Sequence, residues 1–361
     1  RLQASLPEKD EAVALRGTAF RFYVVAVSVD RDEIVALTER ILYRFRDPVT
    51  SRNRLVRIRV RAGLAPFAPD DAFDEARKHT RISLRVLREQ SSTRSIGFFD
   101  DTAQHHMDRR IQIESDMSRG DFLDQLRIYF QPIVDLSNAG AVVGYEALVR
   151  WEHPEMGMVS PGDFIPIAEE NGIILDLGWF VLKKSLEMAS RLESRTAASE
   201  TVPFVSVNVS PVQLMEADLP RHFANSLDDA RVPRDRIKIE ITETVLEETQ
   251  DTFWQVADAF RVLGLAIAID DFGSGSSAFR RIHDFNFDTL KIDQHFIRHV
   301  DFTAKSRTLL ESITRLAVTL NMMPIAEGIE TEEHVQFVRE AGCRYGQGYL
   351  FGKPAPMDTY V

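Results

Sequence analysis

From residue 127 onward the chain alternates apolar, strand-like segments with helical segments. The strand candidates are RIYFQPIVDL, AVVGYEALVRW, VPFVSVNVS, RIKIEITE, LAIAIDDFG, TLKID, MPIAEG and GQGYLF, and stretches such as WFVLKKSLEMASRLESR lie between them. Strands that alternate with helices predict a largely parallel sheet that is buried on both faces. About eight such strands favour closure into a TIM-like β/α barrel. A doubly wound open sheet is the alternative.

The first hundred residues follow a different pattern and predict a smaller α/β domain over residues 1–100. Its expected helices carry apolar residues at helical spacing, and one expected strand alternates apolar with basic residues. In chain order we expect a strand at 20–29, a helix at 31–45, a strand at 55–68, a helix at 70–90 and a strand at 95–100.

Residues 101–121 are polar and poor in Gly and Pro, which predicts a linker helix before a barrel at 122–361. His105 and His106 lie next to each other in this segment. Adjacent residues do not share a helix face, so a solvated linker explains these histidines better than a metal site does.

The formal net charge of −11 argues against DNA as a partner. An anionic substrate can still bind where a metal cation reverses the local field. The single cysteine, Cys343, excludes a disulfide framework and fits a buried thiol. The chain has neither a membrane-length apolar run nor a secretory signal, so we expect a cytoplasmic protein. A start at Arg1 suggests a fragment, with room for a sensor or membrane domain upstream.

Polar residues, most of them acidic, recur at or near the ends of the predicted strands. In a parallel barrel the carboxyl ends of the strands meet at one mouth, where active sites lie. We therefore expect these side chains to converge: Glu146, Asn208, Glu240, Glu243, Asp270, Asp271, Lys291, Glu327, Glu330 and Gln347.

So many carboxylates would repel one another strongly, and Lys291 alone cannot neutralise them. Divalent cations can, and oxygen ligands without His or Cys favour Mg²⁺ or Mn²⁺ over zinc. Adjacent Asp270 and Asp271 suit a bridging ligand and its neighbour in a two-metal site, an arrangement used for phosphodiester hydrolysis. One such acid alone would more often be a helix cap or a surface residue. Recurrence on successive strands favours a metal site.

The motifs together resemble the EAL family of cyclic di-GMP phosphodiesterases over residues from about 122 to 356. They are YFQPIVDL, GYEALVRWEHPEMG, FIPIAEENGII, NVSPVQL, EITET, DDFGSG, LKID, AEGIE and GQGYLFGKP. The resemblance implies a barrel that hydrolyses cyclic di-GMP to linear pGpG with two Mg²⁺ or Mn²⁺ ions, and a homodimer formed through the barrel.

The resemblance also implies a role for individual residues. It implies that Lys291 orients the attacking water, that Gln347 lies near the site and that Glu243 steadies the loop that follows the two aspartates. Leu148 would lie in the floor of the substrate site, with Gln131, Arg150 and Glu330 contacting the dinucleotide. The implied metal ligands are Glu146, Asn208, Glu240, Asp270, Asp271 and Glu327.

Two stretches depart from the family patterns. After the double Asp the family has Gly-Thr-Gly-Tyr-Ser-Ser, whereas residues 273–278 read Gly-Ser-Gly-Ser-Ser-Ala. We expect this loop to limit the rate, and Ser276→Tyr with Ala278→Ser to raise it; the alternative is that Phe279 or another side chain already anchors the loop and the substitutions are neutral. Residues 1–100 resemble the second half of a GGDEF diguanylate cyclase domain, but RGTAF at 16–20 lacks both acids of the cyclase signature. This resemblance implies a degenerate regulatory domain; a structural α/β cap is the alternative.

Two other functions compete with hydrolysis. A non-catalytic receptor would bind cyclic di-GMP and signal through the linker helix, and a scaffold would bind only partners. Receptors of this kind have typically lost some of the metal-site acids. All of them are present here, which favours the enzyme.

Overall fold

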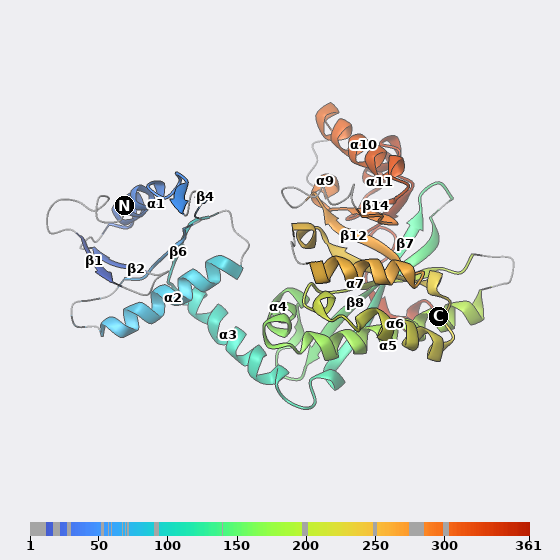
Figure 1. The fold of residues 1–361 in the computed structure, drawn as a ribbon, viewed down its shortest axis with the longest axis horizontal. Coiled ribbons are helices and arrows are strands. Elements are labelled where there is room, and N and C mark those ends of the chain that lie inside the picture. The colour runs from blue at the N-terminus through green and yellow to red at the C-terminus, as the bar shows by residue number, and fades with distance from the viewer. Residues whose placement is uncertain are drawn as a thin grey trace. The chain divides into compact units, whose positions relative to one another are not determined.

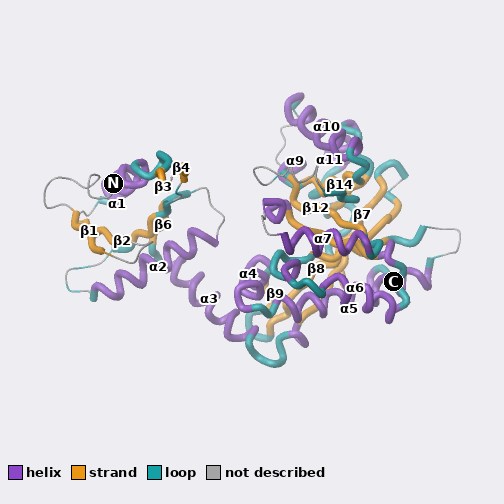
Figure 2. Tube along the Cα trace, in the orientation of Figure 1, coloured by secondary structure: helices purple, strands orange, loops and turns teal. Residues whose placement is uncertain are grey.

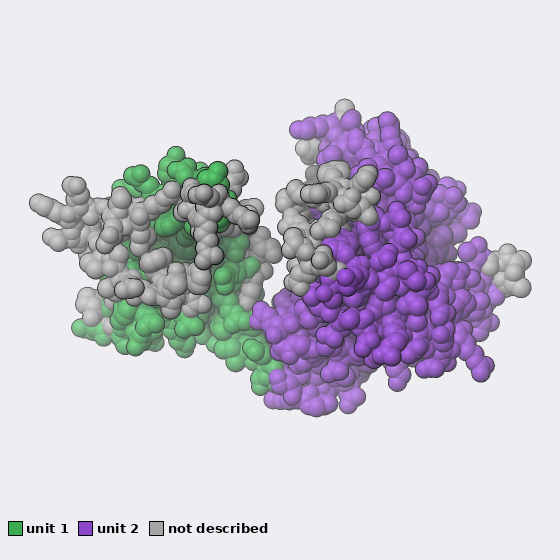
Figure 3. Space-filling view, viewed as in Figure 1, with its two compact units in different colours: residues 1–115 green, residues 116–361 purple. Residues whose placement is uncertain are grey.

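The computed structural model forms two compact units, residues 1–115 and 116–361 (Figure 3). Each unit is described separately below, and Figure 1 labels the elements. The structure describes residues 12–16, 22–26, 30–51, 54–56, 58, 60–66, 68, 70, 72–89, 94–138, 140–196, 201–247, 251–273, 285–298 and 303–361.

The N-terminal unit contains short strand pairs and two main helices. The predicted helices are present as α1 (Arg31–Tyr43) and α2 (Phe73–Glu89). The single strand predicted at 55–68 is wrong, because two short strands with different partners occupy that segment. The strand pairs are antiparallel β1 (Ala12–Arg16) with β2 (Phe22–Ala26), antiparallel β3 (Val49–Ser51) with β4 (Arg54–Val56), and parallel β5 (Ala62–Leu64) with β6 (Ile96–Phe98).

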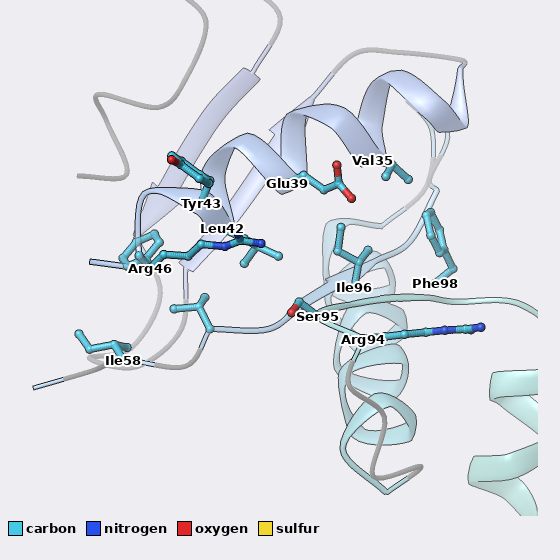
Figure 4. Close-up of a pocket in the computed structure, with 12 residues that line it drawn as sticks. Val35, Glu39, Leu42, Tyr43, Arg46, Ile58, Arg94, Ser95, Ile96 and Phe98 are labelled. Carbon is cyan, nitrogen blue, oxygen red and sulfur yellow. The ribbon is translucent and has the colours of Figure 1, made fainter. Parts of the chain in front are cut away.

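A hollow of about 650 Å³ opens in this unit between α1 and the segment around β6 (Figure 4). Its walls are mixed. Leu42 and Ile96 are apolar, whereas Glu39 and Arg46 are charged. Every residue that lines the hollow is at least partly exposed to solvent, so it is an open hollow and not an enclosed cavity.

Helix α3 (Asp101–Met117) occupies most of the predicted linker. It begins after Asp100, whose carboxylate accepts a hydrogen bond from the Ala103 backbone N–H at 2.8 Å. It ends four residues before the predicted boundary at 121 and is followed by a short 3₁₀ turn at Leu123–Gln125. No helix among the described residues is long and apolar enough to cross a membrane.

Eight strands of the C-terminal unit close into a ring, which confirms the predicted barrel and excludes the open sheet (Figure 2). The ring closes because β7 pairs with both β8 and β15. Seven strands run parallel, but β7 is antiparallel to both neighbours. The ring strands are β7 (Leu126–Asp135), β8 (Ala141–His153), β10 (Phe204–Asn208), β11 (Ile237–Thr242), β12 (Ala266–Phe272), β13 (Thr289–Ile292), β14 (Met323–Ala326) and β15 (Tyr345–Gln347).

Helices outside the barrel cover its strands. The longest, α5, buries an apolar stripe that includes Leu182, Leu186 and Met188. Two of the helices have threonine caps: Thr303 before α10 and Thr331 before α11. The outer elements are β9 (Gly157–Val159), α4 (Pro161–Asn171), α5 (Ile174–Arg195), α6 (Leu219–Ala230), α7 (Asp251–Val262), α9 (His295–Arg298), α10 (Ala304–Thr319), α11 (Glu332–Glu340) and β16 (Ala355–Pro356).

Apolar side chains fill the middle of the barrel. Ile133, Phe204 and Ile325 form a buried cluster there. Gly144 has no side chain because the Phe204 ring occupies that space: a Cβ at residue 144 would lie 2.5 Å from the ring. This filled layer forms the floor beneath the polar side chains described next.

Candidate active site

Four carboxylates surround one lysine inside the barrel. Lys291, on β13, is completely buried. Its Nζ atom lies 2.8 Å from Glu327, 2.9 Å from Glu240, 3.0 Å from Asp270 and 3.3 Å from Glu146. These five residues come from five different strands or strand ends, as the barrel prediction required.

Some of the predicted site residues lie in the middle of strands and not at strand ends. Glu146 is inside the long strand β8, and Gln131 faces it from the antiparallel strand β7. Gln347 joins them: its Nε2 donates to Glu146 at 2.6 Å and to Gln131 at 3.0 Å. Asn208, aligned with Glu240 on the neighbouring strand, donates to Glu146 at 2.9 Å. The side-chain amides of Gln347 and Asn208 therefore both donate to the Glu146 carboxylate.

The electrostatics of Glu146 and Glu240 differ because their hydrogen bonds differ. Burial alone would raise the pKa of Glu146, but Lys291 and the amides of Gln347 and Asn208 hold it below the ordinary value. Burial raises the pKa of Glu240 to about 8; Lys291 opposes this rise, and the charges of Glu146 and Asp270 add to it.

The other charged groups show the same crowding. Burial and neighbouring carboxylates raise the pKa of Glu327 well above its ordinary value. Burial, Asp270 and Asp293 raise the pKa of Asp271 to about 6. Burial would lower the pKa of Lys291, but the surrounding carboxylates raise it well above 10.5. The ammonium is therefore charged at neutral pH, and the carboxyl groups around it outnumber it four to one.

The donor set fits two divalent cations. Glu146, Glu240 and Asp270 can place one oxygen each within 4.8 Å of one another, and so can Asp270, Asp271 and Glu327. Asp270 belongs to both groups, as a bridging ligand would. All these donors are oxygens, which suits Mg²⁺ or Mn²⁺.

A buried oxygen without a partner also points to a cation. Among the described residues, Glu240 Oε1 is buried and accepts no hydrogen bond. A bound cation would satisfy it. Asn208 presents its amide nitrogen to Glu146, and rotating that amide would turn its oxygen toward the acids instead.

The backbone turns sharply at the second aspartate. Asp271 has a positive φ of 55°, and its N–H donates to the Asp270 carboxylate at 3.0 Å. Left-handed backbone at a non-glycine residue is uncommon and often occurs at functional sites. Glu243 accepts from the Gly273 N–H at 2.6 Å, which places Glu243 beneath this turn. The rest of the predicted rate-limiting loop, residues 274–278, lies outside the described residues.

The predicted substrate residues lie around the mouth. Leu148 and Arg150 follow Glu146 on the same face of β8 and are partly exposed. The Arg150 guanidinium lies 5.9 Å from the centre of the Tyr129 ring. Glu330 is exposed and pairs with Arg298, and no contact between Glu330 and the acidic cluster is seen in the described part of the chain.

The sequence analysis did not predict two residues that lie at or next to the acidic cluster, Asp293 and Lys238. Asp293 follows β13, helps to raise the pKa of Asp271, and accepts from the His295 N–H at 2.8 Å. The strand-end rule that singled out Lys291 could have found it. Lys238 lies inside the barrel below Glu240, 3.8 Å from the centre of the Phe204 ring, and burial lowers its pKa to about 8. Strand alternation could have found it, because Lys238 lies two residues before Glu240 in RIKIEITE and therefore on the same strand face.

A family model described as the EAL domain matches residues 116–354. The chain belongs to the EAL domain family. It is 31% identical over 360 residues to an uncharacterized signaling protein of Caulobacter vibrioides, covering 99% of this chain and 43% of that protein. It is also 31% identical over 307 residues to the probable cyclic di-GMP phosphodiesterase PdeI of Escherichia coli, covering 85% of this chain and 38% of that protein. This chain spans about half the length of its curated relatives, or less.

Solved EAL structures share the fold. The PaMucR phosphodiesterase in complex with c-di-GMP matches with a TM-score of 0.64 and 31% identity, over 69% of this chain and 100% of that one. The EAL enzyme Bd1971, bound to cAMP and cyclic di-GMP, matches with a TM-score of 0.65 and 27% identity, over 81% of this chain and 76% of that one.

Proposed function

We propose that the EAL domain hydrolyses cyclic di-GMP to linear pGpG with two Mg²⁺ or Mn²⁺ ions. The observation that carries this proposal is the pair of overlapping acidic groups joined at Asp270, with Lys291 among them. The PaMucR complex with c-di-GMP and the relatives named as cyclic di-GMP phosphodiesterases support the choice of substrate.

The protein's own residues would act in three ways. Glu146, Glu240, Asp270, Asp271 and Glu327, with Asn208, would hold the cations. When bound, the cations would supply Lewis-acid charge and activate a water for attack on phosphorus. Lys291 stays protonated and would donate a hydrogen bond that orients that water.

The mouth residues would bind the dinucleotide. The forked Arg150 guanidinium donates in pairs, as a phosphate or a guanine edge requires. Leu148, Gln131 and Glu330 would complete the contacts, with Gln347 and Glu243 supporting the acids and the following turn. We also propose a homodimer formed through the barrel. A non-catalytic receptor is disfavoured because every acid of the predicted metal set lies at the site.

The decisive test is incubation of the purified chain with cyclic di-GMP and Mg²⁺ or Mn²⁺, with chromatography to detect pGpG. We expect hydrolysis with either cation and none in excess chelator, because no protein group replaces the missing charge. Binding of cyclic di-GMP without any pGpG would support the receptor instead. Full activity in chelator would refute the two-metal mechanism.

For the N-terminal unit we propose a degenerate GGDEF-like module. An alignment over 362 residues with MucR of Pseudomonas aeruginosa, a bifunctional diguanylate cyclase/cyclic di-GMP phosphodiesterase, covers all of this chain at 28% identity and supports this assignment. We expect no cyclic di-GMP from GTP and Mg²⁺, because RGTAF lacks the acids that cyclase chemistry needs. Chromatography of a Glu146→Ala variant, which cannot consume the product, would detect any synthesis and thereby contradict the assignment.

A further inference from the structure

A buried pair joins the end of α3 to the end of β8. His153 Nε2 lies 2.9 Å from Asp116 Oδ2, and both side chains are almost completely buried. Asp116 lies in the last turn of α3, and its other oxygen pairs with Arg119 at 3.0 Å. Both carboxylate oxygens are therefore engaged.

The two ring nitrogens of His153 have fixed roles. Nδ1 accepts hydrogen bonds from the backbone N–H groups of Glu155 at 3.1 Å and Met156 at 3.0 Å. A nitrogen that accepts carries no proton, so Nε2 is the donor to Asp116. One side of the ring holds the turn after β8, and the other holds the end of the helix.

An aromatic cluster strengthens the same junction. Trp151 is completely buried, packs against Phe122 at 5.0 Å and Phe164 at 5.7 Å between ring centres, and donates to Gln125 at 2.9 Å. Trp151 and His153 lie on one face of β8, since alternate residues of a strand share a face. Leu148 and Arg150 lie on the opposite face, toward the proposed substrate.

The outer half of β8, residues 148–153, depends on this junction for its position. β10 pairs with β8 only over Gly144–Ala147, a segment that includes Glu146. Beyond Ala147, β8 pairs with β7 and with the short strand β9. The metal-ligand part of β8 is therefore held by the closed barrel, whereas the substrate-facing part is held by its pairing with β7 and β9 and by contacts with residues 116–125 and with Phe164 of α4.

We propose that Asp116 and His153 are positioning residues that set the place of Arg150 and Leu148, and so the affinity for the dinucleotide, without setting metal binding. The inference rests on cyclic di-GMP being the ligand. Asp116 belongs to α3 and is hydrogen-bonded to His153. A displacement of that helix end would therefore move His153, and with it the part of β8 that carries Arg150.

Two substitutions at His153 separate its two roles. An Asn side chain reaches the place of Nδ1 and a Gln side chain the place of Nε2. His153→Asn therefore keeps the acceptor for the turn and loses the donor to Asp116, whereas His153→Gln does the reverse. Asp116→Asn is a second test of the link, and Asp108→Asn is its control, because Asp108 is an exposed residue of the same helix.

In the full chain, His153→Asn should raise KM for cyclic di-GMP about tenfold, with kcat and Mn²⁺ affinity within about twofold of wild type. His153→Gln and Asp108→Asn should leave KM within about threefold. Asp116→Asn should follow His153→Asn. An unchanged KM in both link variants, or a loss confined to kcat or Mn²⁺ affinity, would overturn the proposal.

Hydrogen exchange gives a readout that does not depend on turnover. Amides of residues 148–153 should exchange at least about fivefold faster in His153→Asn, while those of residues 144–147 stay unchanged. Equal exchange in both segments would overturn the positioning role even if the wild type hydrolyses cyclic di-GMP. A wild type that neither binds nor hydrolyses the dinucleotide would refute the proposed function, and exchange would still decide the positioning role.

Discussion

Glu240→Gln will abolish turnover and, in the absence of metal, make the protein more stable at alkaline pH. The variant loses one oxygen ligand of the first acidic group. Losing several kcal/mol of transition-state stabilisation lowers the rate about a thousandfold or more. The effect on stability has the opposite sign, because Glu240 is buried beside other carboxylates.

The pH dependence follows from the pKa of Glu240, which rises from 4.5 to about 8 in the folded chain. Between these values the folded protein holds a proton that the unfolded chain has released, so this group's contribution to stability falls as pH rises. The full penalty, reached above pH 8, is on the order of 5 kcal/mol. Glutamine avoids it, so the two proteins should be equally stable near pH 4.5 and differ most above pH 8.

Urea unfolding in chelator between pH 5 and 9 measures this difference. Glu193→Gln is the control, since Glu193 is an exposed residue that pairs with Arg236 at the surface, and its replacement should change stability by less than about 1 kcal/mol. Mn²⁺ should stabilise the wild type strongly and Glu240→Gln weakly. A Glu240→Gln variant that is less stable than wild type at pH 8.5 in chelator would mean that the carboxylate stabilises the fold.

The barrel could be predicted from the sequence because buried parallel strands are continuous apolar runs, which few other structures produce. The orientation of β7 could not, since an apolar run does not record which way its neighbours run. Glu146 was predicted as a residue at or near a strand end and Gln131 from the family motif, although neither lies at a strand end. The register of the antiparallel pair is what brings them together.

Contacts between distant segments could not be predicted from the sequence either. Lys238 shares a strand face with Glu240, but only closure of the barrel places it over the Phe204 ring. His153 belongs to a recognised motif, but its partner Asp116 lies 37 residues earlier, at the end of a helix. In the N-terminal unit the segment 55–68 alternates regularly, yet it divides because β4 and β5 pair with different strands.

Replacement of Lys291 by Met tests the same electrostatics by removing the positive charge of the cluster instead of one of its carboxylates. Methionine is of similar length but leaves the four carboxylates around Lys291 without their shared cation. Removing one partner from a buried charged network typically costs about 3–5 kcal/mol. Without Lys291 the folded-state pKa values of these carboxyls rise, that of Glu146 from below its ordinary value and those of Glu240 and Glu327 from already raised values. The loss of stability in chelator should therefore be largest above pH 8 and shrink toward pH 5, where the carboxyls of the variant are protonated.

Metal separates the structural role of Lys291 from its catalytic role. In Lys291→Met, saturating Mn²⁺ should restore most of the stability by supplying positive charge to the acids, but turnover should stay about a hundredfold or more below wild type because no group orients the water. Lys184→Met is the control: Lys184 forms a half-exposed pair with Glu187 at 3.0 Å and should change neither property measurably. A Lys291→Met protein as stable as wild type in chelator at pH 8.5 would mean that the acids do not depend on this lysine. Full turnover with Mn²⁺ would instead assign the orientation of the water to the cations alone.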